Sequence, residues 1–360
     1  MIVVQLKKFE VTNFKGFKDC FTFDLSKTKD YSFHPEFIQN QVIQKALIYG
    51  KNGVGKSNLG YALFDITLLL GNINHIHYHN EAYLNLDSTF NYATFHYEFI
   101  HEDQVITITY KKENYNHLLS EEIKVNNTLL LSYQRNSLEE MIMISSNEYL
   151  RQDIQLSHSE TILSYIEHPL IKELIHFIHH MRWYRFNFQK MDEQKTNPNL
   201  DQLIIQTNSV PHFQALLKAN GISYQLLYKT INGISQIYVH YQKEDVPFLD
   251  VASSGTKSLY YYFYFSLLFK DTTLLFLDEF DALYHYETAE TILNLLFQNK
   301  NMQIFVVSHN TYLMKNALIR PDCCFLLRDG KITSLAYLTD KEIQETHNLE
   351  KMYRNGAFKE

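Results

Sequence analysis

The chain has 360 residues, 45% of them hydrophobic, and a formal net charge of −7 at pH 7. Such a chain can bury a large core as one domain or two lobes, and its acidic balance excludes a surface that is basic overall, which limits any nucleic-acid contact to a local patch. The three cysteines, two of which are the adjacent Cys323 and Cys324, form no disulfide framework and no metal-binding spacing. We therefore expect a reducing, cytoplasmic environment. We expect no membrane attachment, because the longest apolar stretch, Leu259 to Phe269, is too short to span a bilayer.

The start of the chain is predicted to form two strands joined by a turn. Apolar residues alternate with polar ones from Phe9 to Val11 and again from Phe21 to Leu25, which is the period of a half-buried strand. The run Asn13-Phe14-Lys15-Gly16-Phe17 interrupts this alternation and marks the turn.

Residues 50–57 read Gly-Lys-Asn-Gly-Val-Gly-Lys-Ser and fit the phosphate-binding pattern G-x-x-x-x-G-K-S/T at every fixed position. An apolar strand at 46–49 precedes the run, and apolar residues at helical spacing follow it. In such a loop, backbone N–H groups at a helix N-terminus surround the phosphates of a nucleotide. We expect Lys56 to reach the β- and γ-phosphates of ATP, Asn52 to touch the γ-phosphate and Ser57 to ligate Mg²⁺. The predicted nucleotide-binding residues of this run are Gly50, Lys51, Asn52, Gly53, Val54, Gly55, Lys56, Ser57 and Asn58.

The centre of the chain changes from alternating to helical patterns. Alternation over 94–110 predicts two strands, and a further hairpin is expected near residue 126. Residues 136–220 are predicted to be mainly helical, with helices starting near Pro169 and Ser209. We interpret this block as an insertion between two halves of one α/β nucleotide-binding domain.

A pair of acidic residues follows the apolar strand at 274–277. These residues, Asp278 and Glu279, stand where a magnesium–phosphate site needs one carboxylate for the metal and one to polarise the attacking water. We assign the metal to Asp278 and the role of catalytic base to Glu279. The alternative is a buried strand with two incidental acids at its tip, which the upstream phosphate loop disfavours.

Another apolar strand ends in Val306-Val307-Ser308-His309. A histidine at this point can donate to the γ-phosphate and sense whether it is present, although a lone histidine at a strand end is more often structural. The order and spacing of the motifs favour the functional interpretation of His309.

Between the phosphate loop and the acidic strand, small residues open a helix at 252–259 and form a second backbone anion site. Within one chain this site has no phosphate of its own, and we expect it to close over the ATP of a second subunit. An ordinary serine-rich helix cap is the alternative. The residues concerned are Ser253, Ser254, Gly255 and Thr256.

These four runs, in this order, resemble the ABC-type ATPases, in particular the soluble branch that includes SMC, RecF and the OLD proteins. The opening turn at 13–17, the run at 253–259 and the ending Asn348 to Gly356 are similar, more narrowly, to AAA-labelled ATPases of bacterial abortive-infection and anti-phage systems (AbiL-like). The resemblance implies a D-loop at 281–283. It also implies that 252–257 is a divergent signature.

The resemblance implies an α/β fold: an ABC-ATPase-type nucleotide-binding domain with a mixed sheet and a P-loop core, plus a mainly helical insertion lobe. We divide the chain into an N-terminal half with the phosphate loop at 1–135, the helical insertion at 136–220 and a C-terminal half at 221–360. The last part holds the signature, the Walker B strand and the switch residue His309.

The function implied by the resemblance is ATP hydrolysis with Mg²⁺ in a head-to-tail homodimer or higher homo-oligomer. The chain would act as a sensor or scaffold that controls a separate effector, a nuclease or toxin, in anti-phage defence. A RecF-like DNA-repair ATPase that clamps DNA on ATP binding is the alternative, which the acidic balance disfavours. A nucleotide-gated assembly protein with negligible hydrolysis is a third hypothesis, and Glu279 argues against it.

Three other features are open to two interpretations. His75, His77 and His79 alternate as metal ligands on a strand could, or lie in a solvated loop. The basic and aromatic segment from His176 to Arg185 contacts nucleic acid or a partner, or forms a helix with a packed apolar face. Gln104 competes for the position of the Q-loop glutamine.

Overall fold

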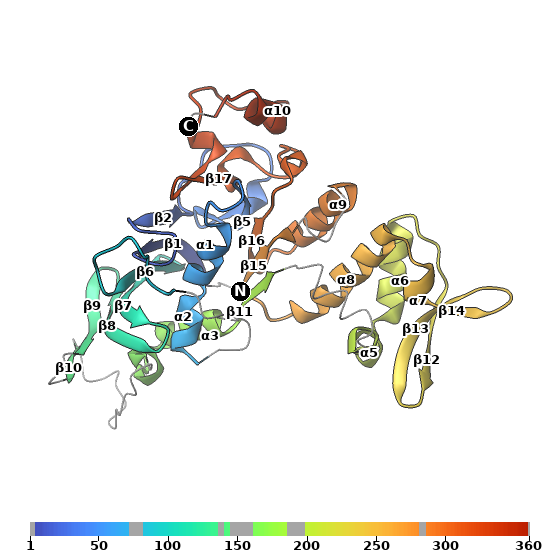
Figure 1. Cartoon of the computed structure of the whole chain (residues 1–360), viewed down its shortest axis with the longest axis horizontal. Helices are drawn as coiled ribbons and strands as arrows, with labels where there is room; N and C mark the ends of the chain where they lie inside the picture. The colour runs from blue at the N-terminus through green and yellow to red at the C-terminus, as the bar shows by residue number, and fades with distance from the viewer. Residues whose placement is uncertain are drawn as a thin grey trace. The chain divides into compact units, whose positions relative to one another are not determined.

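The computed structural model describes residues 4–71, 82–135, 140–144, 161–185, 199–280 and 286–358 (Figure 1). The chain forms two compact units. The first unit comprises Met1–Tyr184, Thr273–Asp278 and Asn299–Glu360, and the second comprises Arg185–Thr272 and Glu279–Gln298.

A six-stranded sheet forms the centre of the first unit (Figure 1). β15 (Leu274–Asp278), β16 (Gln303–Val307), β5 (Lys45–Tyr49) and β17 (Cys324–Arg328) run parallel to one another, whereas β18 (Lys331–Ser334) is antiparallel to β17. Every side chain of β15, β16 and β5 is buried, as expected of parallel strands that are covered on both faces. The strand order is β11 (Met181–Arg185), β15 (Leu274–Asp278), β16 (Gln303–Val307), β5 (Lys45–Tyr49), β17 (Cys324–Arg328) and β18 (Lys331–Ser334).

A second sheet of the first unit has seven antiparallel strands and confirms the predicted hairpins. Buried and half-buried residues alternate along its strands, because one face packs on the core. Its order is β10 (Glu140–Ile144), β9 (Thr128–Arg135), β8 (His117–Val125), β7 (Gln104–Asn114), β6 (Ala93–His101), β1 (Gln5–Thr12) and β2 (Phe21–Asp24). A short pair, β3 (Ile38–Gln39) and β4 (Val42–Ile43), lies between β2 and β5 in the chain.

The helices of the first unit pack closely on these sheets. Gly60 allows α1 to approach the six-stranded sheet, since a Cβ there would lie 2.8 Å from Trp183 Cζ2 and 3.0 Å from Phe276 Cε1. The buried Asp65 joins the next helix to β7, because its Oδ1 accepts hydrogen bonds from Lys112 Nζ at 2.9 Å and from the Tyr110 hydroxyl at 3.0 Å. The α-helices are α1 (Lys56–Leu63), α2 (Asp65–Leu69), α3 (Pro169–His179) and α10 (Leu349–Arg354), and the 3-10 helices are η1 (Pro35–Phe37), η3 (Ile162–Tyr165), η5 (Thr311–Leu313), η6 (Pro321–Cys323) and η7 (Leu335–Tyr337).

The second unit contains five helices and a three-stranded antiparallel sheet in the described part of the chain. The carboxylate of Asp201 holds them together, since it accepts hydrogen bonds from the Tyr260 hydroxyl at 2.6 Å and from the Ile237 N–H at 3.0 Å. The elements are α5 (Asn199–Gln206), α6 (Val210–Ala219), α7 (Phe248–Val251), α8 (Ser254–Leu268), α9 (Tyr286–Phe297), β12 (Leu226–Ile231), β13 (Ile234–His240) and β14 (Asp245–Pro247).

The two units do not coincide with the three consecutive segments predicted from the sequence. Within the predicted insertion, α3 starts at Pro169 as expected, but α3 and most of β11 belong to the first unit. Of the described helices of this block, α5 and α6 belong to the second unit. One interpretation of the segment from His176 to Arg185 is a helix with a packed apolar face, but Met181–Arg185 form the strand β11. Its Trp183 is nevertheless packed, with 5% exposure. No helix in the described ranges is long and apolar enough to cross a membrane.

Candidate functional site

Three neighbouring parallel strands of the first unit end at one edge of the six-stranded sheet. β5 leads into the phosphate loop, β16 into Ser308-His309, and β15 ends in Asp278. The register pairs Leu277 with Val306 and Val307 with Ile48, so the three strands end almost level. Ligands of open α/β sheets bind outside the carboxyl ends of the strands, and the fold therefore brings these three motifs together.

The glycines of the phosphate loop meet specific conformational demands. Gly53 and Gly55 have φ angles of +80° and +103°, which side-chain-bearing residues rarely adopt. A Cβ at Gly50 would lie 2.6 Å from the carbonyl oxygen of Leu327, so a larger residue would displace the loop from β17. These constraints produce a loop that passes directly into the N-terminus of α1, which suits an anion.

Lys56 opens α1 and is only 7% exposed. Its Nζ donates to the carbonyl oxygens of Gly50 at 2.8 Å and Lys51 at 2.7 Å, which keeps the ammonium group inside the loop. Lys51, Asn52 and Gly53 are exposed at the loop tip, while Val54, Gly55, Ser57 and Asn58 are half-buried. A cradle of this kind, with a buried lysine and a helix N-terminus, fits the phosphates of a nucleotide.

The turn between β1 and β2 lies against the phosphate loop. A Cβ at Gly16 would lie 2.7 Å from Asn58 Nδ2, and Phe17 carbons are 3.4 Å from the Cβ position of Gly55. Asn13, with a φ angle of +57°, anchors the turn by donating through Nδ2 to the carbonyl oxygens of Phe90 and Tyr92. The opening motif of the chain thus supports the loop, a role that the sequence did not reveal.

The two acidic residues at the end of β15, Asp278 and Glu279, belong to different units of the structure. Asp278 is buried, with 1% exposure, and belongs to the first unit. Carboxylate and hydroxyl oxygens suit Mg²⁺, so Asp278 and Ser57 have the chemistry for the metal of Mg·ATP. Glu279 follows with a φ angle of +56°, a left-handed conformation that is costly for a residue with a side chain and is concentrated at functional sites.

The carboxylate of Glu279 is held by Arg185, the last residue of β11. Arg185 donates to Glu279 Oε1 through Nη2 at 2.7 Å and through Nε at 3.3 Å. Both residues belong to the second unit. The sequence placed Arg185 in a basic segment for nucleic acid or a partner, and its separation of 94 residues from Glu279 left no local signal of this pair.

Ser308 and His309 follow directly after β16. The Ser308 N–H donates to the Ile48 carbonyl oxygen at 3.1 Å, which fixes this end of β16 beside β5. Ser308 Oγ accepts from the Asn310 N–H at 3.0 Å. His309 is exposed, so its ring is accessible to a ligand at this sheet edge.

The predicted signature lies in the second unit, at the start of α8. Ser253 is the N-cap residue, and its Oγ accepts from the Thr256 N–H at 3.2 Å. Ser253 and Ser254 are exposed, Gly255 is half-buried and Thr256 is buried. A pocket of about 290 Å³ adjoins Ser253, Gly255 and Thr256.

Several predicted features lie elsewhere. Gln104 starts β7 at the β6–β7 turn, paired with His101, and is therefore on the antiparallel sheet and not on the sheet of the phosphate loop. The predicted D-loop at 281–283 and the histidines at 75–79 lie outside the described residues. Within the described ranges, no cluster of three or more His, Cys, Asp or Glu side chains has the arrangement of a metal site.

The strand order and the motifs at its carboxyl edge define an ABC-type nucleotide-binding fold with a P-loop. The family model described as "AAA domain, putative AbiEii toxin, Type IV TA system" matches residues 45–315. The chain belongs to this family of AAA-type ATPase domains.

Among the solved structures that are similar to this chain are three SMC heads. The SMC head domain from Thermotoga maritima is 15% identical, with 91% of this chain and 97% of that chain covered and a TM-score of 0.46. An SMC head bound to the C-terminal winged-helix domain of ScpA is also 15% identical, over 91% and 96%, with a TM-score of 0.48. The SMC head of Pyrococcus furiosus, bound to the C-terminal domain of ScpA, is 14% identical over 98% of both chains, with a TM-score of 0.46. No curated protein sequence matches the chain. With TM-scores below 0.5, the fold assignment rests on the strand order and motifs of this chain.

Proposed function

We propose that the protein is an Mg·ATP-hydrolysing ABC-type ATPase that acts as the sensor or scaffold of an anti-phage system and controls a separate effector. The observation that carries the ATPase part is the alignment of three neighbouring parallel strands, which end in the phosphate loop, Ser308-His309 and Asp278. The family description, which names a toxin and a toxin–antitoxin system, supports the defence setting. The AbiL-like role is part of the proposal and rests on the sequence motifs alone.

The first unit would bind the substrate. Lys56 would exchange its two loop carbonyl contacts for the β- and γ-phosphate oxygens, and Asn52 would contact the γ-phosphate from the exposed loop tip. Ser57 and Asp278 would hold Mg²⁺, which neutralises charge on the phosphates when bound.

Hydrolysis would use Glu279 as the base that polarises the attacking water. The two bonds from Arg185 end on Oε1 alone, and this geometry leaves Oε2 as the oxygen for water. His309 would donate to the γ-phosphate and report its presence. Arg185 would then act as a positioning residue that fixes the orientation of the carboxylate.

The signature would act in a second copy of the chain. Ser253, Ser254, Gly255 and Thr256 start the 15-residue helix α8, whose first N–H groups can receive an anion. A head-to-tail homodimer, or a higher homo-oligomer, would place this segment over the partner's ATP. ATP binding would close the assembly and hydrolysis would open it, which converts nucleotide state into a signal for the effector.

The test is phosphate release and native mass of Glu279→Gln beside the wild-type protein, each expressed with its genomic neighbours. We expect Glu279→Gln to bind ATP, to lose about a hundred- to ten-thousand-fold in turnover and to accumulate in an assembly that contains another polypeptide. Near-normal turnover would refute the base assignment. An ATP-dependent dimer without a second polypeptide, whose turnover rises with DNA, would replace the defence proposal with DNA repair.

A further inference from the structure

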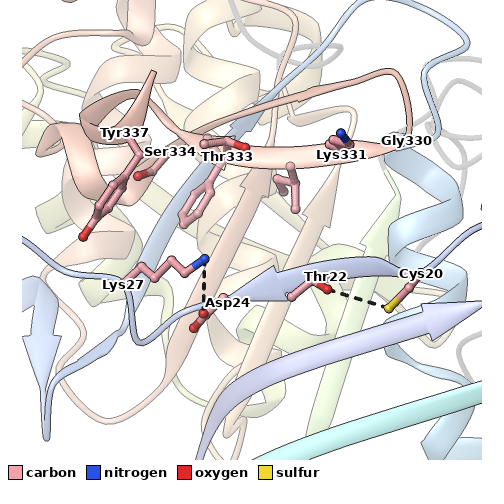
Figure 2. Close-up of a pocket in the computed structure, with 11 residues that line it drawn as sticks. Cys20, Thr22, Asp24, Lys27, Gly330, Lys331, Thr333, Ser334 and Tyr337 are labelled. Atoms are coloured by element: carbon pink, nitrogen blue, oxygen red, sulfur yellow. Dashed lines mark hydrogen bonds and ion pairs between the residues drawn. The ribbon is translucent and has the colours of Figure 1, made fainter. Parts of the chain in front are cut away.

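The two sheets of the first unit leave a pocket between their outer strands. β2 is the last strand of the seven-stranded sheet and β18 the last strand of the six-stranded sheet. The pocket between them has a volume of about 520 Å³, within the range of about 300–1,000 Å³ that small-molecule sites occupy. Figure 2 shows Lys27 and Asp24 on the β2 side and Ser334 and Tyr337 on the β18 side.

We propose that this pocket binds a small organic anion that carries an aromatic ring, at a site separate from the nucleotide. The proposal goes beyond ATP hydrolysis and does not depend on it. None of the residues that line the pocket belongs to β5 or to the phosphate loop that follows it.

The hydroxyl of Ser334 is the first observation in favour of a ligand. Ser334 is 4% exposed, and within the described part of the chain its Oγ has no hydrogen-bond partner. The residue is the N-cap of η7, yet its side chain makes no capping hydrogen bond. A buried hydroxyl without a partner is unfavourable, and a change of the Ser334 rotamer that turns Oγ into the pocket would let a ligand oxygen satisfy it.

Charge favours an anion. Lys27 and Lys331 both line the pocket, against a single carboxylate, Asp24. That carboxylate is already satisfied, because its Oδ1 accepts from the N–H and hydroxyl of Ser26 and its Oδ2 lies 3.7 Å from Lys27 Nζ. An incoming carboxylate or phosphate would therefore meet an excess of cationic groups.

The apolar lining favours a ring. Phe325 is buried and packs edge-on against Phe23 with ring centroids 5.1 Å apart, which fixes it as a rigid wall. Tyr337 is 46% exposed, and its hydroxyl donates to the Thr28 carbonyl oxygen at 3.1 Å. Lys29 Nζ lies 4.9 Å from the centroid of the Tyr337 ring, so this ring is also held in place. Two fixed aromatic rings in one pocket suit a planar guest.

The test is ligand-observed NMR on the full-length protein with saturating ADP, so that the phosphate loop is occupied. Salicylate and AMP are the probes that combine ring and anion; benzyl alcohol lacks the anion and inorganic phosphate lacks the ring. We expect salicylate or AMP to bind at least tenfold more tightly than either control compound. Preference for AMP would identify a nucleotide as the natural class, and preference for salicylate an aromatic acid.

Variants locate the binding. Lys27→Glu should weaken probe binding at least tenfold, and Ser334→Leu should abolish probe binding. The control Lys218→Glu changes an exposed residue of α6 in the second unit and should leave probe binding unchanged. Hydrogen exchange of the wild-type protein gives the same answer without a variant: the probe should protect 20–27 and 330–337. Affinity no better than that of the control compounds, no effect of both variants, or displacement of the probe as ADP is raised would each overturn a separate site.

Discussion

Replacing Arg185 with alanine tests whether this residue orients the proposed catalytic base. The side chain donates two hydrogen bonds to a single oxygen, Oε1 of Glu279. Glu279 follows the last residue of β15 with a left-handed backbone, and Arg185 holds the carboxylate of this residue. Without Arg185 the carboxylate samples other rotamers, and only a fraction of the molecules present Oε2 to water.

The magnitude follows from the exposure of the pair. Hydrogen bonds to charged groups contribute about 1.5–3 kcal/mol when protected from water. The side chains of Arg185 and Glu279 are 45% and 33% exposed, and exposed ion pairs contribute about 0.2–1 kcal/mol. With about 1 kcal/mol available for orientation, Arg185→Ala should lower kcat about fivefold. KM for ATP should not change, because the phosphate loop is untouched.

The assay is steady-state phosphate release, with Arg182→Ala as the matched control on the same strand. Arg182 donates to the carbonyl oxygens of His179 and Met181, so its loss should not affect kcat. Arg185→Lys should be intermediate, and added guanidinium should partly rescue Arg185→Ala. In a Glu279→Gln background the arginine substitution should have no further effect. A kcat within twofold of the wild type, a higher kcat, or additive effects of the two substitutions would refute the positioning role.

Three further predictions concern binding, assembly and stability. Lys56→Ala should abolish ATP binding measured by calorimetry, and unchanged affinity would contradict the phosphate-loop assignment. Ser253→Arg should leave ATP binding intact but prevent the ATP-dependent dimer in light scattering; a dimer that still forms would refute the signature in trans. Burial raises the pKa of Glu121 to about 7, although Thr161 and the Ile162 N–H donate to its carboxylate. The carboxyl therefore ionises in the unfolded chain, at about pH 4.3, before it ionises in the folded protein. The free energy of unfolding falls as pH rises across this interval. Glu121→Gln should therefore raise Tm over wild type at pH 8 more than at pH 5, whereas an equal difference at both pH values would contradict the buried-acid assignment.

The parts of the site that the sequence predicted are those encoded within a few residues. The phosphate loop needs glycines at 53 and 55 for their positive φ angles and a lysine at the start of a helix, so its pattern is visible locally. The strand that ends in Asp278 is visible in the sequence as well, because the apolar run from Leu274 to Leu277 is followed by an acid. The hairpins of the antiparallel sheet followed from alternation of period two.

What the sequence concealed depends on contacts between distant segments. β11 has only five residues and follows a helix after one residue, so its alternation was too short to outweigh the helical pattern around it. Its place beside β15 is a property of the strand order. Trp183 is buried because Gly60 leaves room for the indole. The residues next to Gly60 or Trp183 in the sequence give no signal of this contact.

The placement of β11 also explains why an arginine meets the proposed base. β11 is the outer neighbour of β15 in the six-stranded sheet. The chain passes from the first unit to the second after Tyr184 in β11 and after Asp278 in β15. Arg185 and Glu279 are therefore the first residue of the second unit at each of these two crossings, and they bond to each other. The charge that we propose to orient the base comes from β11, the neighbour of β15 that leads neither into the phosphate loop nor into His309.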